Sequence, residues 1–96
     1  MDTVQAIKSV LSEKLNELHK FGVSEIWLFG SAARGQADYA DLDFLVSFSQ
    51  PPGLVEFMEL KFYLEALFGK PVDLHTKQSC PERFYKRIEN ELRHVA

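Results

Sequence analysis

The sequence has little of what marks several specialised protein classes. It contains one cysteine, Cys80, so no internal disulfide framework is available, and a reducing environment fits. No apolar run approaches the roughly 20 residues that a membrane span needs. The N-terminus lacks the basic start and apolar core of a signal peptide. These absences predict a cytoplasmic protein that makes no membrane contact.

Positive charge is also scarce. Eleven Lys and Arg residues face fourteen Asp and Glu residues, a formal net charge of −3. Dedicated nucleic-acid binders are usually basic, so no direct nucleic-acid binding is expected. A small nucleotide that arrives with its own metal ion is not excluded. The chain has 96 residues, 46% of them hydrophobic, which is enough for one modest core. We therefore expect residues 1–96 to form a single domain.

The apolar pattern predicts helices that alternate with short strands. Apolar residues at helical spacing predict an amphipathic helix over residues 3 to about 20, and Gly22 follows as a helix terminator. Branched and aromatic runs predict strands at 25–29, 42–48 and 71–76. Further helices are predicted at 54–68 and 81–92, with a short helical turn after Gly30. This order indicates an α/β or α+β fold: a small mixed sheet of three or more strands, flanked by helices.

Two aspartates, Asp41 and Asp43, open the second strand. Side chains two apart on a strand share a face, roughly 6.6 Å apart along the chain. Carboxylates that converge to about 4 Å repel by about 4 kcal/mol at an effective dielectric constant near 20. A divalent cation between them would remove this cost, and Mg²⁺ prefers carboxylate oxygens. The alternative is that both side chains are simply solvated at a strand entrance.

The neighbourhood favours the metal site. Gly30 and Ser31 follow a strand and open a helical turn, where free N–H groups and a hydroxyl suit a phosphate. Asp73, between two apolar residues of the third strand, faces the same ion if that strand lies beside the second. It is then placed to bind metal and to accept a proton. His75 shares the face of Asp73; we expect it to face solvent, with a nucleotide contact as the alternative.

The segments GSAARG, DLD and VDL together resemble the minimal nucleotidyltransferase domain of the DNA polymerase β superfamily. The resemblance extends over nearly the whole chain and implies a polymerase β-like nucleotidyltransferase fold. It implies catalytic and metal-binding roles for Asp41, Asp43 and Asp73, with one or two Mg²⁺ ions. It also implies nucleotide-binding roles for Gly30, Ser31 and Arg34; Arg34 either neutralises phosphate charge or packs against the acidic site.

The reaction implied by the resemblance is transfer of a nucleoside monophosphate from a triphosphate, AMP from ATP first among them, to a hydroxyl. Family members are often paired with a HEPN-domain toxin and act as antitoxins by adding AMP to one of its tyrosines. The helix at 54–68 is apolar on more than one side, which suits a contact surface. Transfer to a small molecule would need an acceptor-binding domain that 96 residues do not contain. The sequence does not decide whether the protein forms a homo-oligomer.

Two positions depart from the family pattern. Ala40 stands where a serine is usual, and the loop between Ser31 and Asp41 is one residue shorter than usual. These departures motivate an alternative: a nucleotide-binding module, weak or inactive in catalysis, that neutralises a partner by masking its surface.

Overall fold

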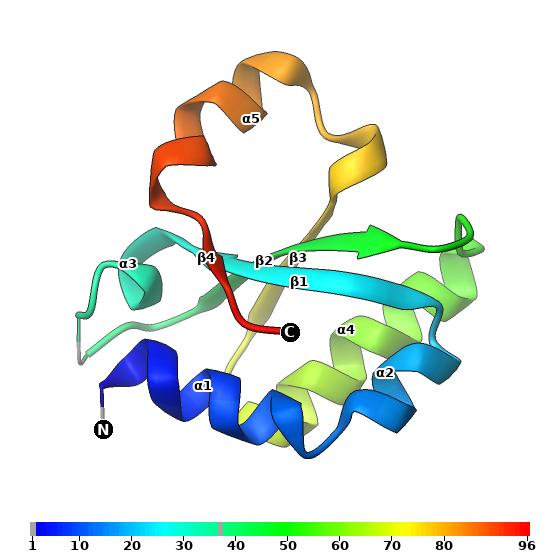
Figure 1. The fold of residues 1–96 in the computed structure, drawn as a ribbon, viewed down its shortest axis with the longest axis horizontal. Helices are drawn as coiled ribbons and strands as arrows, with labels where there is room; N and C mark the ends of the chain where they lie inside the picture. The colour runs from blue at the N-terminus through cyan, green and yellow to red at the C-terminus, as the bar shows by residue number, and fades with distance from the viewer. Residues whose placement is uncertain (1, 37) are drawn as a thin grey trace.

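A four-stranded mixed sheet forms the centre of the molecule (Figure 1). The computed structural model describes residues 2–36 and 38–96. The strands are β1 (Val23–Phe29), β2 (Leu42–Phe48), β3 (Val72–Thr76) and β4 (Arg93–His94), in the spatial order β3-β2-β1-β4. β2 runs antiparallel to β1 and parallel to β3, and β4 pairs antiparallel with β1. The expected fold class is confirmed, and the sequence missed the fourth strand.

Helices cover both faces of this sheet. α1 (Thr3–Ser12), α2 (Leu15–Lys20) and α4 (Leu54–Phe68) lie on one face, and α5 (Glu82–Ile88) lies on the other (Figure 1). The short α3 (Gly30–Ala33) directly follows β1. Two 3₁₀ turns, η1 (Lys77–Ser79) and η2 (Glu89–Glu91), flank α5. No helix in residues 2–36 and 38–96 is long and apolar enough to cross a membrane.

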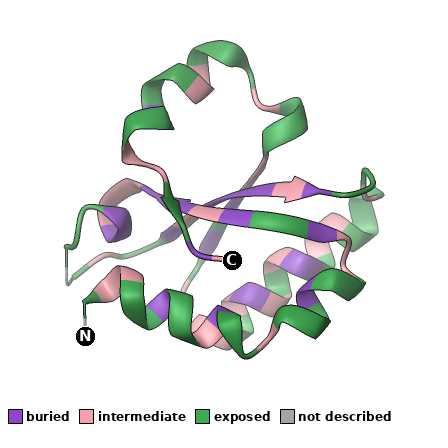
Figure 2. Cartoon of the chain, viewed as in Figure 1, coloured by how far each residue is buried: buried purple, intermediate pink, exposed green. Residues whose placement is uncertain are grey.

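Side-chain alternation along β2 divides the core into two layers. Leu42, Phe44 and Val46 are fully buried in the cluster that includes side chains of α1, α2 and α4. Leu45 points the other way and packs with Phe29 and Ile88 beneath α5. β2 is therefore covered on both faces, as the buried residues in Figure 2 show. Each such apolar side chain contributes about 2 kcal/mol by its burial.

The predicted helix over residues 3–20 is wrong in one respect, because the chain breaks it into α1 and α2. The N–H groups of Glu13 and Lys14 donate to carbonyls three residues back, at 3.2 and 3.0 Å, which makes a tight turn. The Ser12 hydroxyl donates to the carbonyl of Ser9 at 2.8 Å, a local bond that competes with regular helix. The bend leaves Leu15 exposed and Leu18 buried.

The last helix is also shorter than predicted. α5 ends at Ile88, and the chain continues through η2 into β4 rather than as a helix to residue 92. By contrast, α4 has the predicted bounds and ends at Gly69, whose positive φ of 66° suits a glycine cap. Its apolar surface exceeds what the core covers: Leu54 is 78% exposed and Phe62 is 56% exposed.

Candidate active site

Asp43 and Asp73 lie side by side in the sheet. Asp43 is the second residue of β2, Asp73 is the second residue of β3, and the parallel register pairs them directly. Register partners point to the same face, and neighbouring strands are about 4.8 Å apart. Asp43 is half-buried, whereas the Asp73 side chain is 63% exposed. The structure thus brings together two of the three predicted carboxylates, from segments 30 residues apart.

The electrostatics around Asp43 show an excess of negative charge. Burial raises the pKa of the Asp43 carboxyl, and the charges of Asp73 and then Asp41 raise it further. Glu91 adds a smaller contribution in the same direction, and His75 partly offsets the effect. Asp41 is exposed just ahead of β2 but is near enough for its charge to act. Three acidic side chains therefore act on the half-buried Asp43 carboxyl.

The chemistry of this cluster suits a hard divalent cation. Carboxylate oxygens are the preferred ligands of Mg²⁺. The pKa of Asp43 is raised first by burial and then by repulsion from neighbouring carboxylates, and a cation would relieve this repulsion. The side chains as placed form no ready-made cage: no three acidic, histidine or cysteine side chains of the described residues are arranged to hold a metal ion. The fit therefore rests on the donor set and its uncompensated charge.

His75 lies against this cluster. Its Nε2 is 3.3 Å from Oδ2 of Asp73, and its ring packs 4.8 Å from that of Phe84 and 5.7 Å from that of Phe29. The expectation of a solvent-facing imidazole holds only in part: the His75 side chain is 34% exposed, and Phe84 of α5 covers the rest. The prediction that His75 shares a strand face with Asp73, two residues earlier, is confirmed by their contact. His75 is positioned to orient the Asp73 carboxylate.

The Gly30–Ser31 turn adjoins Asp43. Phe29 is the register partner of Asp43, so the turn begins one residue beyond it. Gly30 has a φ of 78°, and a Cβ atom placed there would overlap Oδ2 of Asp43. Only glycine therefore combines this backbone conformation with this close approach. Ser31 is half-buried at the same turn. The predicted phosphate turn and the Asp43 carboxylate are in direct contact.

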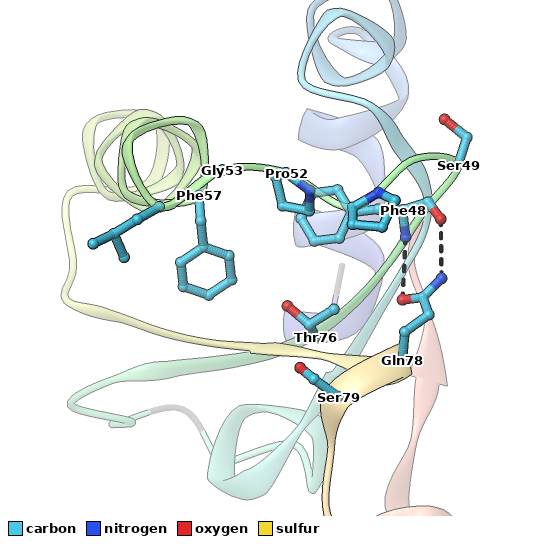
Figure 3. Close-up of a pocket in the computed structure, with 10 residues that line it drawn as sticks. Phe48, Ser49, Pro52, Gly53, Phe57, Thr76, Gln78 and Ser79 are labelled. Carbon is cyan, nitrogen blue, oxygen red and sulfur yellow. Dashed lines mark hydrogen bonds between the residues drawn. The ribbon is translucent and has the colours of Figure 1, made fainter.

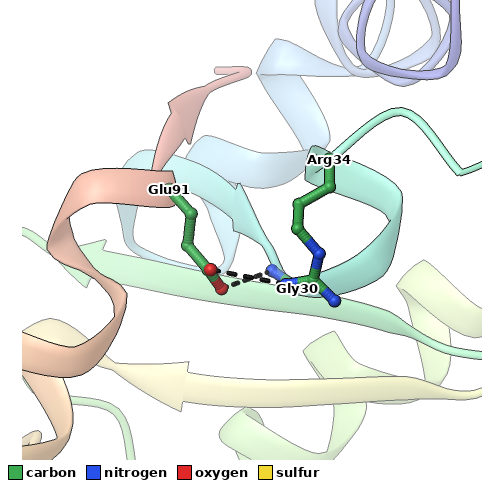
Figure 4. A network of polar contacts seen from close by, with 3 residues as sticks. All are labelled: Gly30, Arg34 and Glu91. Carbon is green, nitrogen blue, oxygen red and sulfur yellow. Dashed lines mark hydrogen bonds and ion pairs between the residues drawn. The ribbon is translucent and has the colours of Figure 1, made fainter.

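Glu91 enters the site from the C-terminal segment (Figure 4). Its Oε1 accepts a hydrogen bond from the backbone N–H of Gly30 at 3.0 Å, and its Oε2 lies 3.4 Å from a guanidinium nitrogen of Arg34. Arg34 was expected either to neutralise phosphate charge or to pack against the acidic site; in the structure its acidic partner is Glu91. Glu91 was not predicted as a site residue, because it is 61 residues from Gly30 and belongs to no motif.

Comparisons with known proteins identify the family of the chain. A family model for the nucleotidyltransferase domain matches residues 8–95. The chain belongs to this family. The nucleotidyltransferase is 43% identical to the protein adenylyltransferase MntA of Thermococcus cleftensis over 97 residues, which span 99% of this chain and 98% of that protein.

Solved structures share the fold. One, provisionally described as a minimal nucleotidyltransferase, matches with a TM-score of 0.76 and 30% identity over 97% of this chain and 95% of that one. Another is the MNT antitoxin complex with the tri-AMPylated HEPN toxin of Shewanella oneidensis. It matches with a TM-score of 0.71 and 19% identity, over 97% of this chain and 71% of that one. Because the identity to this antitoxin is only 19%, the match supports the fold alone.

The nucleotidyltransferase has a further cavity, of about 580 Å³, at the opposite end of β2 and β3 (Figure 3). Its walls are largely apolar and include Phe48, Pro52 and Phe57. The polar group of Gln78 is already engaged there: its Oε1 accepts from the Phe48 N–H at 3.5 Å, and its Nε2 donates to the Phe48 carbonyl at 2.9 Å. By volume alone this cavity would be the candidate active site. The acidic side chains that suit the chemistry lie at the other end of the two strands.

Proposed function

We propose that this nucleotidyltransferase transfers AMP from ATP to a hydroxyl group, a tyrosine of a HEPN-domain partner, and thereby acts as an antitoxin. The direct pairing of Asp43 with Asp73 beside Gly30 is the observation that carries the proposal. The name of the Thermococcus relative supports AMP as the transferred group. The AMPylated HEPN toxin bound to an MNT antitoxin of the same fold supports the acceptor.

The roles follow from the chemistry of each group. Asp41, Asp43 and Asp73 would hold one or two Mg²⁺ ions, which neutralise phosphate charge when bound. The Gly30 N–H, the Ser31 hydroxyl and the Arg34 guanidinium would bind phosphate oxygens. Asp73 accepts the proton of the attacking hydroxyl, and His75 at 3.3 Å holds that carboxylate in place. The hydroxyl oxygen forms a bond to the α-phosphorus of ATP. The bond between the α-phosphorus and the oxygen that bridges the α- and β-phosphates breaks, and pyrophosphate leaves.

Incubation of the purified protein with α-labelled ATP, Mg²⁺ and a HEPN partner tests the proposal. The partner should gain label at a tyrosine, and chelation of Mg²⁺ should stop the transfer. Asp73→Asn and Asp43→Asn should each slow transfer by about 100-fold or more. Glu13→Gln, at the exposed C-terminal end of α1, serves as the matched control and should retain activity. An Asp43→Asn variant that labels the partner at the wild-type rate would contradict the assignment.

The exposed apolar side of α4 favours a second candidate function, masking of a partner without turnover. Leu54, Val55 and Phe62 are 78%, 65% and 56% exposed on one helix, an arrangement that suits protein contact. The two functions separate experimentally. If an Asp41→Asn, Asp43→Asn double variant still binds and neutralises the partner, and the wild type transfers no label, masking is the function.

A further inference from the structure

Glu91 holds two of the groups that the proposed function assigns to phosphate. One of its carboxylate oxygens accepts from the Gly30 N–H, and the other lies beside the guanidinium of Arg34 (Figure 4). Carboxylate and phosphate oxygens present the same chemistry to such donors: both accept charge-assisted hydrogen bonds from N–H groups and pair with guanidinium. A phosphate at this turn would therefore need the donors that Glu91 now occupies.

We propose that Glu91 is an internal competitor for the phosphate turn, and that a nucleoside triphosphate binds only when its phosphate displaces the Glu91 carboxylate from Gly30 and Arg34. The inference rests on the proposed function, because that function makes Gly30 and Arg34 part of the nucleotide site. Glu91 is thereby a regulatory residue that sets nucleotide affinity. It is not a catalytic residue.

The two contacts differ in strength, and this difference makes displacement feasible. The bond to Gly30 is short, at 3.0 Å, and part-buried. The pairing with Arg34 is 3.4 Å long, and the Arg34 side chain is 53% exposed, so it adds little free energy. Glu91 also adds negative charge around Asp43. A bound triphosphate would face this charge, so departure of the carboxylate removes repulsion as well as competition.

The structure has room for the displaced side chain. A cavity of about 410 Å³ lies beside the contact and is lined by Arg34, Glu91 and Arg93, among others. The Glu91 side chain can rotate into this space while β4 keeps its pairing with Trp27 and Leu28 of β1. Arg93 on the rim offers the displaced carboxylate another cation. Nucleotide binding is thereby coupled to the conformation of η2, the segment that carries Glu91.

Two substitutions at Glu91 test the charge of the side chain and its length separately. Glu91→Gln keeps the size and removes the charge, whereas Glu91→Asp keeps the charge on a side chain one methylene shorter. Glu89→Gln, in the same 3₁₀ turn, is the matched control. The dissociation constant of the Mg²⁺ complex of AMP-PNP is measured by calorimetry for all four full-length proteins, each first checked for folding by circular dichroism.

Glu91→Gln should lower the dissociation constant about tenfold, because a hydrogen bond to a charged acceptor is lost from the competing state. Glu91→Asp should also tighten binding, and Glu89→Gln should leave it unchanged. The Gly30 amide resonance in a ¹H–¹⁵N spectrum reports the contact itself. It should shift in Glu91→Gln without ligand, and in the wild type on addition of nucleotide.

The results separate the inference about Glu91 from the proposed function. Equal or weaker nucleotide binding by folded Glu91→Gln and Glu91→Asp would overturn the inference and leave the proposed function intact. Tighter binding by these variants with no AMP transfer to any partner would leave the inference standing and overturn the proposed function. Failure of every variant, including the wild type, to bind nucleotide would overturn both.

Discussion

Asp43→Asn should make the metal-free protein more stable, although it removes a side chain on which the proposed reaction depends. In the folded state the Asp43 carboxylate is half-buried and lies next to Asp73 in the parallel register. Asparagine has nearly the same shape and no charge. The substitution therefore relieves both the burial of a charge and its repulsion from neighbouring carboxylates.

The strand spacing sets the size of the effect. Two carboxylates about 5 Å apart repel by about 3 kcal/mol at an effective dielectric constant of 20 and by about 0.8 kcal/mol in bulk water. The Asp73 side chain is 63% exposed, so the value near the solvent limit applies. A gain of about 1 kcal/mol is expected, which for a domain of this size raises the melting temperature by about 5 °C.

The gain depends on pH with a definite sign. The pKa of Asp43 is raised in the folded state, so between the unfolded and folded values the folded protein binds more protons than the unfolded chain. The stability of the wild type therefore falls as the pH rises through this window and stays reduced above it. The advantage of Asp43→Asn should be greatest at neutral pH and should vanish below the ordinary pKa of aspartate.

Thermal melts in EDTA between pH 3 and pH 8 measure this difference, with Glu59→Gln as the control for loss of an exposed carboxylate. Mg²⁺ should raise the melting temperature of the wild type more than that of Asp43→Asn, because a ligand stabilises the state that binds it. A melting temperature of Asp43→Asn at or below that of the wild type at pH 7 in EDTA would refute the reasoning.

Three further substitutions test other parts of the structure. Gly30→Ala should cost about 1–2 kcal/mol in backbone strain and more from collision with Asp43, whereas Gly35→Ala, with a similar φ of 82° and open space around it, should show the strain alone in urea unfolding. Gln78→Ala removes three hydrogen bonds to Ser47 and Phe48 at the end of β2 and should cost about 1–2 kcal/mol in the same assay; an unchanged midpoint would contradict the bonding. The pKa of Glu65 is lowered, chiefly by the first backbone N–H of β3, so its stabilisation is present at neutral pH and is lost as the pH falls through the folded value. Glu65→Gln should therefore reduce stability at pH 7 and flatten the acid limb of the stability–pH curve.

The parts of the fold that local patterns determine were predictable from sequence. β2 and α4 have the predicted bounds, 42–48 and 54–68, because a run buried on both faces and a helix ended by glycine each leave a strong local signal. The pairing of Asp43 with Asp73 followed from the two-residue period together with one assumption, that β3 lies beside β2.

The parts that depend on the path of the whole chain were not predictable. β4 has only two residues, both exposed, which is too short for any periodicity to appear. Glu91 reaches Gly30 only because β4 returns to pair with β1 and carries η2 over the site. The break between α1 and α2 depends on a turn at Ser12 that the apolar spacing does not encode.

The position of Asp43 argues that the two strand-entrance aspartates are not equivalent. Asp41 is exposed just ahead of β2, where water solvates its carboxylate at little cost in stability. Asp43 lies inside a strand in which five of seven residues are buried, with Leu42 and Phe44 on either side fully buried. An apolar residue at this half-buried position would remove the charge repulsion and add about 1 kcal/mol from partial burial. A carboxylate in such a place lowers the stability of the free protein, and perturbed groups of this kind concentrate at functional sites. The same cost explains why the cluster suits a cation: the ion would restore the free energy that the three neighbouring acidic side chains remove.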